Sequence, residues 1–495
     1  MPAFELPPTA TRLFIGGERV PGAGAPLIVR SPATEQPIAE FAGASSDQID
    51  QAIQAARDRF DSGVWSGLTP AARGGYVRRL LGHLAEHKAA LKEIIVAETG
   101  CPTSSPVMMA QLDSPISASA GLIDIYQALP EVEDHGQPLA ERINHMGQLV
   151  QSLRRHAPVG VVAAIAAYNF PLFTAVWKII PALLTGNTVV LRPNPLTPLV
   201  TLALADAALA AGLPAGVLNI VAEAGADAAV RLTVDPRVDM VTFTGSNDVG
   251  AKVMEQAAGT LKRIQLELGG KSAQIYLPDS VERAASAAAG VCLAHAGQGC
   301  VLGTRVFVPE ADKARVMDAM AASLSGVVIG DPTDPKTQMG PVISANQRAR
   351  CERYTQLAVD AGGRVVCGGR RPAHLDKGFY FEPTVLDLPD NKNPAAQDEI
   401  FGPVIGVMGY QSLDHAVEMA NDTVFGLSGY VHGKDLKTAT AIAQRLRTGT
   451  VNVNTGATNP AYVSSGGWGR SGYGRERGAE GLRIYQQVQV LNLAN

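Results

Sequence analysis

The sequence predicts an α/β fold that contains two parallel sheets, and three observations support this prediction. The chain has 495 residues, and a chain of this length usually folds around more than one hydrophobic core. From Pro158 onward, apolar strand patterns alternate with helical patterns, which is typical of parallel strands joined by right-handed crossovers. A second strand–helix series begins near Gln274. We therefore expect two large lobes, with a ligand crevice at the carboxyl ends of the first series of strands.

The composition is that of a globular protein without a strong electrostatic preference. Hydrophobic residues make up 46% of the chain and charged residues 18%, and the formal net charge is −4. Lysines and arginines are scattered, so we expect no nucleic-acid partner and no membrane partner. The longest apolar runs, such as residues 158–167, are about half the roughly 20 residues that a membrane span requires.

The cysteines and the N-terminus indicate the compartment. Five cysteines without regular spacing argue against a disulfide framework and favour a reducing environment. Residues 1–11 lack the charged-then-apolar order of a secretory signal. We therefore expect a cytoplasmic protein, and we expect no metal site.

The N-terminal part predicts two short strands around a glycine turn at residues 13–20, followed by two structural helices. A capping-box pattern at residues 45–48 opens the first helix, whose apolar positions recur at helical spacing. The second helix is expected to begin at Thr69-Pro70, where proline fits the first turn, and to continue as one long helix to Gly100.

Residues 147–155 alternate between polar and apolar side chains and have no local hairpin partner. Such a strand is expected to be a sheet edge that pairs with another subunit. A strand-like segment near the C-terminus, at residues 486–491, is a candidate partner for it.

Two strand–helix series make up most of the remaining chain. In the first, strands are predicted at 159–167, 188–191, 217–221, 240–243 and 264–268, with helices at 172–184, 198–211, 224–234 and 249–258. In the second, strands are predicted at 274–277, 305–308, 404–408 and 450–453, with helices at 311–324, 347–361 and 413–420. After the fourth strand, Gly245 permits a tight turn, and the next helix N-terminus offers N–H groups to a phosphate. The same segment also fits an ordinary strand–helix turn.

The most informative short segment is Gly297-Gln298-Gly299-Cys300, which follows a small-residue helix pattern at 281–294. The flanking glycines remove side-chain bulk, so an electrophile can approach the sulfur and backbone N–H groups can bind its oxygen. A free cysteine considered alone is usually a small core hydrophobe. We give that interpretation to the other four cysteines, which are Cys101, Cys292, Cys351 and Cys367.

Three further motifs accompany this cysteine: Tyr168-Asn169-Phe170-Pro171, Leu266-Glu267-Leu268-Gly269-Gly270-Lys271 and Glu399-Ile400-Phe401-Gly402-Pro403. In this order and spacing, from about Leu13 to the last strand, the chain resembles the NAD(P)-dependent aldehyde dehydrogenase superfamily in its non-phosphorylating, acid-forming branch. The resemblance implies a Rossmann-like cofactor domain (residues 1–137 and 158–266), an α/β catalytic domain (267–475) and a small oligomerisation β-element (138–157 and 484–495). It also implies a homodimer or a homotetramer.

The catalytic residues that the resemblance implies are Cys300, Glu267, Asn169 and Lys178. Cys300 is the expected nucleophile, and its N–H and the Asn169 amide are expected to hold the oxyanion. Glu267 is expected to activate the water that hydrolyses a thioester, and Lys178 is expected near the site.

Other interpretations of these residues remain open in the sequence. Glu267 alone is typical of a strand-end carboxylate paired with a lysine such as Lys271, and Asn169 alone is typical of a turn. His295 could suggest a Cys-His hydrolase, but no third orienting group is apparent.

The resemblance implies NAD as the cofactor, with NADP as the alternative. The implied cofactor-binding residues are Ile165, Ala166, Tyr168, Arg192, Gly225, Gly245, Ser246, Val249, Leu268, Glu399 and Phe401. Of these, Glu399 and Phe401 could instead be a helix cap and a core ring. Most relatives have Lys-Pro-x-Glu after the second strand, whereas Pro195 stands here where that glutamate would hold the ribose hydroxyls. Arg192 could bind the ribose or accept a 2′-phosphate.

The implied substrate is a small-molecule aldehyde. The implied substrate-binding residues are Phe170, Thr174, Trp177, Gly299, Val301, Asn459 and Ser465. Many relatives carry Pro-Phe-Gly-Gly where this chain has Ser464-Ser465-Gly466-Gly467, and Asn459 replaces another frequent aromatic residue. The absence of these two aromatic rings predicts a wide substrate tunnel. The motifs also resemble a bacterial subgroup that acts on bulky or long-chain apolar aldehydes.

Two alternatives belong to other functional classes. A CoA-acylating semialdehyde dehydrogenase would pass the acyl group to CoA rather than to water, but the retained Glu267 argues against it. A non-catalytic binding or structural protein on the same scaffold would be expected to lack Cys300 or Asn169, and both are present.

Overall fold

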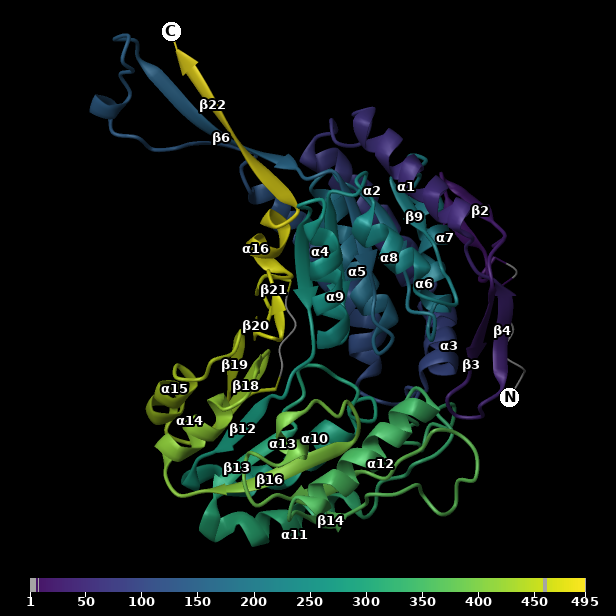
Figure 1. Cartoon of the computed structure of the whole chain (residues 1–495), viewed down its shortest axis with the longest axis vertical. Coiled ribbons are helices and arrows are strands. Elements are labelled where there is room, and N and C mark those ends of the chain that lie inside the picture. Colours follow the sequence, from purple (N-terminus) through teal and green to yellow (C-terminus); the bar gives the residue numbers. More distant parts are fainter. Residues whose placement is uncertain (1–5, 8, 457–460, 495) are drawn as a thin grey trace.

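The chain forms two lobes and a projecting arm (Figure 1). The computed structural model describes residues 6, 7, 9–456 and 461–494. In Figure 1 the purple-to-teal part of the chain forms the upper lobe and the green part dominates the lower lobe. The last strand, in yellow, crosses a blue strand in the arm. The predicted division into two large lobes is therefore confirmed.

An eight-stranded sheet forms the centre of the first lobe. In spatial order its strands are β2 (Glu18–Val20), β1 (Leu13–Ile15), β9 (Leu218–Ile220), β8 (Thr188–Arg192), β7 (Val161–Ile165), β10 (Met240–Thr244), β11 (Arg263–Glu267) and β21 (Gly472–Tyr473). The five predicted strands, β7 to β11, pair in parallel, whereas β1, β2 and β21 pair antiparallel. The strand order reverses between β7 and β10, so the loops that leave these strands open a crevice at the carboxyl edge.

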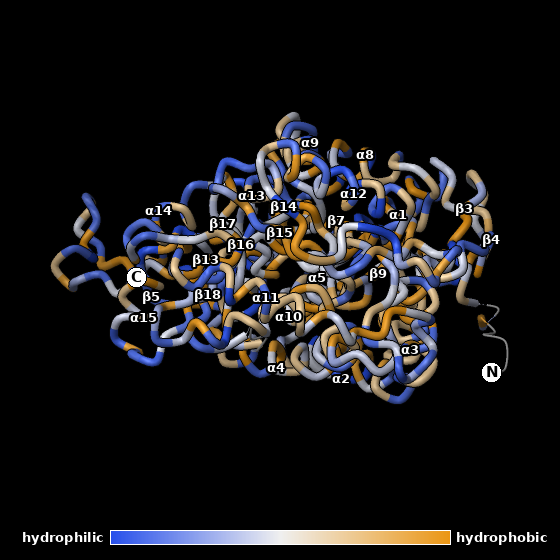
Figure 2. The backbone as a smooth tube through the Cα atoms, turned by 90° about the horizontal axis from the view of Figure 1, so that it is seen from below, coloured by the Kyte–Doolittle hydropathy of each residue, from blue (hydrophilic) through white to orange (hydrophobic). Residues whose placement is uncertain are grey.

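Helices pack around this sheet and enclose its apolar strands. They are α1 (Ser46–Asp61), α2 (Pro70–Glu86), α3 (Lys88–Thr99), α4 (Ser114–Ala128), α5 (Pro171–Leu184), α6 (Leu199–Leu202), α7 (Leu204–Ala210), α8 (Asp227–Val234) and α9 (Asn247–Ala258). Every residue of β7 and β8 is buried, which explains the wholly apolar sequence of β7 and the apolar centre of β8, Val189-Val190-Leu191. Figure 2 shows hydrophobic stretches near β7 and α5 in the middle of the molecule.

Local signals predicted the helix starts better than the helix breaks. The capping box is present, because Ser45 Oγ accepts a bond from the Gln48 N–H and the Gln48 side chain accepts one from the Ser45 N–H. The expectation of one long second helix is wrong, since α2 and α3 separate at His87. The predicted helix at 198–211 is likewise divided at Ala203 into α6 and α7. Apolar spacing continues across both breaks, so periodicity does not reveal them.

A seven-stranded sheet forms the centre of the second lobe. In spatial order its strands are β14 (Arg364–Cys367), β15 (Thr384–Asp387), β16 (Val404–Tyr410), β13 (Arg305–Pro309), β12 (Ala273–Tyr276), β18 (Ser428–His432) and β19 (Thr450–Val453). The four predicted strands are present, but the sequence analysis missed β14, β15 and β18. All neighbours are parallel except β14 and β15, which pair antiparallel.

Two apolar clusters and several helices accompany this second sheet. The helices are α10 (Ala285–Cys292), α11 (Lys313–Leu324), α12 (Ala345–Asp360), α13 (Pro394–Gln397), α14 (Leu413–Asn421) and α15 (Leu436–Ala443). The predicted helix at 281–294 is a 3₁₀ segment, η3 (Pro278–Ala284), followed by α10, so the chain reaches Cys300 from a short helix.

The arm is a three-stranded antiparallel sheet in the order β22 (Gln486–Ala494), β6 (Val150–Pro158) and β5 (Val132–Asp134). The C-terminal segment pairs with the earlier strand, from Gln486 opposite Pro158 to Ala494 opposite Val150, so this predicted partnership is confirmed. The expectation that the earlier strand is a sheet edge is wrong, because β5 and β22 occupy both of its edges.

The remaining elements are short. They are β3 (Pro26–Arg30), β4 (Pro37–Ala42), β17 (Phe425–Gly426), β20 (Trp468–Gly469), α16 (Gly478–Arg483), η1 (Met109–Asp113), η2 (Leu139–Glu141) and η4 (Glu310–Asp312). Among the described residues, none of the helices combines the length and the apolar character that a membrane crossing requires.

One buried arginine connects the second sheet to the loop that follows β11. Arg305 begins β13, and its Nε donates to the Lys271 carbonyl at 2.8 Å. Its Nη1 donates to Asn391 Oδ1 and the Met419 carbonyl, both at 3.0 Å, and its Nη2 donates to the Ala420 carbonyl at 2.9 Å. The side chain therefore fixes the segment after Glu267 against β13.

We predict that Arg305→Met destabilises the protein, because four buried acceptors lose their donor at once. The expected loss in unfolding free energy is at least about 3 kcal/mol, measured by chemical denaturation. The matched control is Arg364→Met, because the Arg364 side chain is 65% exposed and pairs only across the surface with Asp387. Equal losses for the two variants would contradict the assigned role of Arg305.

Candidate active site

The loop that carries Cys300 lies between α10 and β13 and has an unusual backbone. His295, Ala296 and Gly297 have φ values of 53°, 50° and 72°, so three successive residues adopt the left-handed conformation. A side chain at Gly297 would collide with the Gly402 carbonyl, since an added Cβ would lie 2.0 Å from that oxygen. This strained turn places the cysteine at the boundary between the lobes, and the cost is of the kind found at functional sites.

Asn169 follows β7 and contacts this loop directly. Its Nδ2 donates to the Gln298 carbonyl at 2.9 Å, across 129 positions in the chain. Its own carbonyl accepts a bond of 2.7 Å from Gln111 Nε2, a residue of η1. The Asn169 side chain is buried and held at both ends of the residue, so the amide lies within two residues of Cys300 with a fixed orientation.

Glu267 ends β11 and interacts electrostatically with Cys300. Burial raises the pKa of Glu267 well above its ordinary value, and the nearby Glu476 carboxylate raises it further. Burial, followed by the negative charge of Glu267, raises the pKa of the Cys300 thiol to about 12. The structure therefore brings Cys300, Glu267 and Asn169 together from three separate segments. The pairing of Glu267 with Lys271 is not formed, since its cationic neighbours are Lys178, Arg477 and Arg475.

Lys178 lies behind Glu267, on α5. Its Nζ donates to Glu476 Oε1 at 2.8 Å and to Thr242 Oγ1 at 3.1 Å, and the side chain is completely buried. Thr242 in turn donates to the Gln265 side chain. Lys178 therefore neutralises the carboxylate nearest to Glu267. The sequence analysis missed Glu476, although the Gly474-Arg475-Glu476 run ends the segment whose strand β21 pairs with β11.

The reversal of strand order between β7 and β10 provides a crevice for a dinucleotide. Ile165 and Ala166 lie buried at the end of β7, and Gly245 and Ser246 lie at the end of β10. Ser246 is the N-cap residue of α9, yet its hydroxyl makes no capping bond, so both the hydroxyl and the helix N–H groups can meet a phosphate. Val249 is 45% exposed in the first turn of α9, and Leu268 lies buried against the same helix.

The residues expected at the nicotinamide end lie together on the other side of the crevice. Glu399 Oε1 accepts a bond of 2.9 Å from the Gly270 N–H, and burial raises the pKa of Glu399 to about 7. Phe401 has a φ of 61°, which is rare for an aromatic residue, and its ring meets the Tyr168 ring edge-on at 5.9 Å. A cavity of about 480 Å³ lies beside Tyr168, with Gln347 and Arg350 in its wall. These features fit a dinucleotide whose nicotinamide ribose reaches Glu399.

Arg192 occupies a different environment from the one that the sequence suggested. Its Nε donates to Glu223 Oε1 at 3.1 Å and its Nη2 to the Gly225 carbonyl at 2.6 Å. The carboxylate of Glu223 also accepts the Ala228 N–H at 2.7 Å, so Glu223 caps the start of α8. The guanidinium of Arg192 is thus already paired with a buried carboxylate. The sequence analysis missed Glu223, because nothing local indicates its partner 31 positions away.

Residues 20–491 match the aldehyde dehydrogenase family. The chain belongs to this family. It is 36% identical over 480 residues to the putative aldehyde dehydrogenase DhaS of Bacillus subtilis, covering 97% of this chain and 94% of that protein. It is 34% identical to betaine aldehyde dehydrogenase of the same organism, with 96% of each chain covered.

Solved aldehyde dehydrogenases have the same fold. The structure of betaine aldehyde dehydrogenase (betB) from Staphylococcus aureus in complex with NAD+ matches with a TM-score of 0.92 and 33% identity, over 97% of this chain and 94% of that chain. A mutant of aldehyde dehydrogenase C (AldC) from Pseudomonas syringae, complexed with NAD+ and octanal, matches with a TM-score of 0.90 and 33% identity, over 98% of both chains. The protein is therefore an NAD(P)-dependent aldehyde dehydrogenase of the α/β fold that the sequence predicts.

The residues expected at the substrate side of this aldehyde dehydrogenase lie mainly on α5. Phe170 precedes the helix, and Thr174 and Trp177 lie buried on it, with the Phe173 ring 6.2 Å from Phe170 and 5.9 Å from Trp177. Gly299 and Val301 flank Cys300, and the Val301 carbonyl accepts a bond of 2.8 Å from the Tyr430 hydroxyl. Asn459 lies outside the described residues.

Ser465 has a neighbour that the sequence analysis missed. Arg477 Nη2 donates to Ser465 Oγ at 2.6 Å, and the Arg477 guanidinium lies 5.5 Å from the centre of the Trp177 ring. This contact could not be predicted from the sequence, because it depends on the backbone pairing of Ser465 with Glu476 in the folded chain.

His295 does not form a catalytic pair with Cys300 among the described contacts. Its ring is buried, it meets the Phe170 ring edge-on at 5.6 Å, and burial lowers its pKa to about 4. A buried, neutral histidine against an aromatic ring belongs to the packing of the loop.

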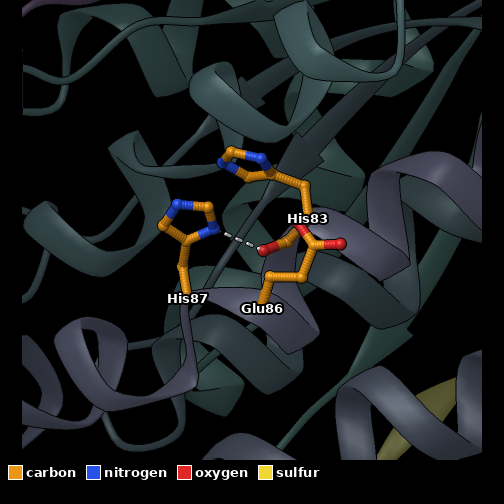
Figure 3. A group of neighbouring side chains, drawn as sticks. All are labelled: His83, Glu86 and His87. Atoms are coloured by element: carbon orange, nitrogen blue, oxygen red, sulfur yellow. Dashed lines mark hydrogen bonds between the residues drawn. The ribbon is translucent and has the colours of Figure 1, made fainter.

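A His-x-x-x-His spacing escaped the sequence analysis. His83, Glu86 and His87, at the end of α2, have potential ligand atoms within 4.8 Å of one another. Figure 3 shows the two imidazole rings stacked one above the other, with His87 Nδ1 bonded to the His83 carbonyl at 2.8 Å. Stacked rings direct their lone pairs side by side rather than toward one point. This cluster belongs to α2, whereas the catalytic residues lie on other segments.

We predict that Glu223→Gln increases the use of NADP+ relative to NAD+. The amide keeps an acceptor for the α8 N–H groups but removes the negative charge that neutralises Arg192 and would repel a 2′-phosphate. The ratio of kcat/KM for NADP+ to that for NAD+ should rise about 10-fold, the value expected for one charge-assisted bond. Asp227→Asn, at the exposed start of the same helix, is the control. An unchanged ratio in Glu223→Gln would contradict this role.

Proposed function

We propose that the protein oxidises an aldehyde to its carboxylic acid in two stages that both pass through Cys300. The observation that supports this proposal most strongly is the convergence of Cys300, Asn169 and Glu267 from three separate segments. In balance, one aldehyde, one NAD+ and one water give one carboxylate, one NADH and two protons.

The first stage forms a carbon–sulfur bond. The Cys300 sulfur adds to the aldehyde carbon, and the carbonyl electron pair moves to the oxygen, where the Asn169 amide and the Cys300 N–H stabilise the negative charge. Because the pKa of the thiol is raised to about 12, its proton must leave as the sulfur attacks. That proton passes to solvent water, so the Glu267 carboxylate, which burial makes more basic than that of an ordinary glutamate, stays available for the second stage. Bound NAD+ supplies the hydride acceptor that converts the adduct to a thioester.

The second stage breaks the carbon–sulfur bond. Glu267 takes a proton from a water molecule, the water oxygen adds to the thioester carbon, and the thiolate of Cys300 leaves with the bonding electrons. Lys178 pairs with Glu476 at 2.8 Å and so offsets the carboxylate that most strongly opposes ionisation of Glu267. The retained Glu267, with this support, favours hydrolysis over transfer to CoA.

We also propose that the tunnel accepts a bulky or long-chain apolar aldehyde. Phe170, Phe173 and Trp177 supply apolar walls, and Gly299 and Ser465 supply little bulk. The relative crystallised with octanal supports this proposal, since its fold matches over almost the whole chain.

A homo-oligomer completes the proposal. The arm leaves the outer edge of β22 without a strand partner among the described residues, and Val488, Val490 and Leu493 on this strand are more than half exposed. A second copy of the chain would cover this apolar edge, as sheet edges usually require. The described cysteines are all free, which suits the reducing conditions of the cytoplasm.

We predict that Cys300→Ala abolishes NADH production from every aldehyde, because no other described cysteine lies beside Glu267. Absorbance of NADH with octanal measures this outcome, with CoA absent from the assay. Cys367→Ala is the matched control, because this thiol is also partly exposed but lies on β14, away from the crevice. Turnover that survives in Cys300→Ala would contradict the assignment of the nucleophile.

A further inference from the structure

The residue after Glu476 has a backbone conformation that its side chain does not favour. Arg477 has φ 65° and ψ 171°, and it stands at the N-cap of α16. Non-glycine residues adopt this region at a cost, so the surrounding structure must hold the residue in place. Backbone hydrogen bonds fix the residues on both sides of Arg477. Ser465 and Glu476 exchange two of them, of 2.9 and 2.8 Å, and the Gly478 N–H donates to the Ala461 carbonyl at 2.7 Å.

This conformation directs the guanidinium to two residues that are expected to line the tunnel. Its Nη2 donates to Ser465 Oγ at 2.6 Å, and its centre lies 5.5 Å from the middle of the Trp177 ring. A hydroxyl and a cation therefore lie beside the Trp177 ring, so one part of this wall is polar and positively charged.

The Arg477 guanidinium interacts electrostatically with the catalytic groups. Burial lowers the pKa of Arg477 from its ordinary value, whereas Glu476, Glu267 and Cys300 favour its charged form. An arginine stays charged under such conditions. Arg477 is partly exposed rather than fully buried.

The acidic groups nearby do not make this part of the tunnel strongly negative. The Glu476 carboxylate forms an ion pair of 2.8 Å with Lys178, which offsets its negative charge. Burial holds the pKa of Glu267 well above its ordinary value, which lowers the negative charge that this residue carries at a given pH. An anionic ligand therefore meets a guanidinium and a hydroxyl here rather than two full negative charges.

Resting on the proposed aldehyde oxidation, we propose that Arg477 and Ser465 bind a carboxylate that the substrate carries at the end remote from its aldehyde group. A guanidinium matches the two oxygens of a carboxylate, and a serine hydroxyl adds a third donor. The apolar rings of Phe170, Phe173 and Trp177 suit the chain between the two ends. The substrate class is then the ω-oxo carboxylic acids, and the product class is the dicarboxylic acids.

A comparison of charged and neutral substrates tests this proposal. We expect kcat/KM for 8-oxooctanoate to exceed that for its methyl ester by about 10-fold or more, the value of one hydrogen bond to a charged group. In Arg477→Met the ratio of the two values should fall to about 1. In Arg477→Lys the ratio should be intermediate, because an ammonium keeps the charge but loses the forked geometry. The same measurements with 4-oxobutanoate and 6-oxohexanoate, each with its ester, find the chain length that spans the tunnel.

Arg445→Met is the matched control, because it also removes one arginine, and Arg445 lies on the surface paired with Asp414. This variant should keep the wild-type ratio. Equal use of acid and ester by the wild-type enzyme would overturn the inference, as would an equal loss for both substrates in Arg477→Met. If Arg477→Met does not fold, the wild-type ratio decides alone. If no aldehyde in the panel reduces NAD+, the proposed function itself fails.

Discussion

The hydrogen bond from Asn169 Nδ2 to the Gln298 carbonyl, at 2.9 Å, is the contact on which the proposed catalytic arrangement depends. It joins the end of β7 to the loop that carries Cys300, and so it fixes the first lobe against the second beside the proposed nucleophile. The same asparagine is held from behind by Gln111. Burial then acts on this fixed arrangement, because it raises the pKa of Glu267 and of the Cys300 thiol together. The proton of the Cys300 thiol must therefore leave before or as the sulfur attacks.

The sequence predicted those parts of the fold that local patterns determine. The strand β7 has a continuous apolar sequence, and the helix that begins after Ser45 has a complete capping box, so both were identified correctly. Elements were missed where the pattern is short, as in β18, or where the apolar spacing continues across a break, as at His87. The arm shows a different limit, since the sequence indicated the partnership of β6 with the last strand but not the third strand that makes β6 central.

The candidate site divides in the same way. Cys300, Asn169 and Glu267 stand in motifs that can be recognised in order along the chain, and the structure places them together. Glu223 and Arg477 could not be identified from the sequence, because their contacts form only in the folded chain. Glu223 contacts Arg192, and Arg477 contacts Trp177 and Ser465. Both are charged residues inside the protein, and a buried charge is expected to have a specific partner or a specific function.

Covalent catalysis at Cys300 is tested most directly by the intact mass of a Glu267→Gln variant mixed with octanal and NAD+. The amide cannot remove a proton from water, so the thioester should accumulate, and the mass should rise by one octanoyl group that peptide mapping locates on Cys300. An unmodified protein after NADH has formed, or an octanoyl group on another cysteine, would contradict the mechanism.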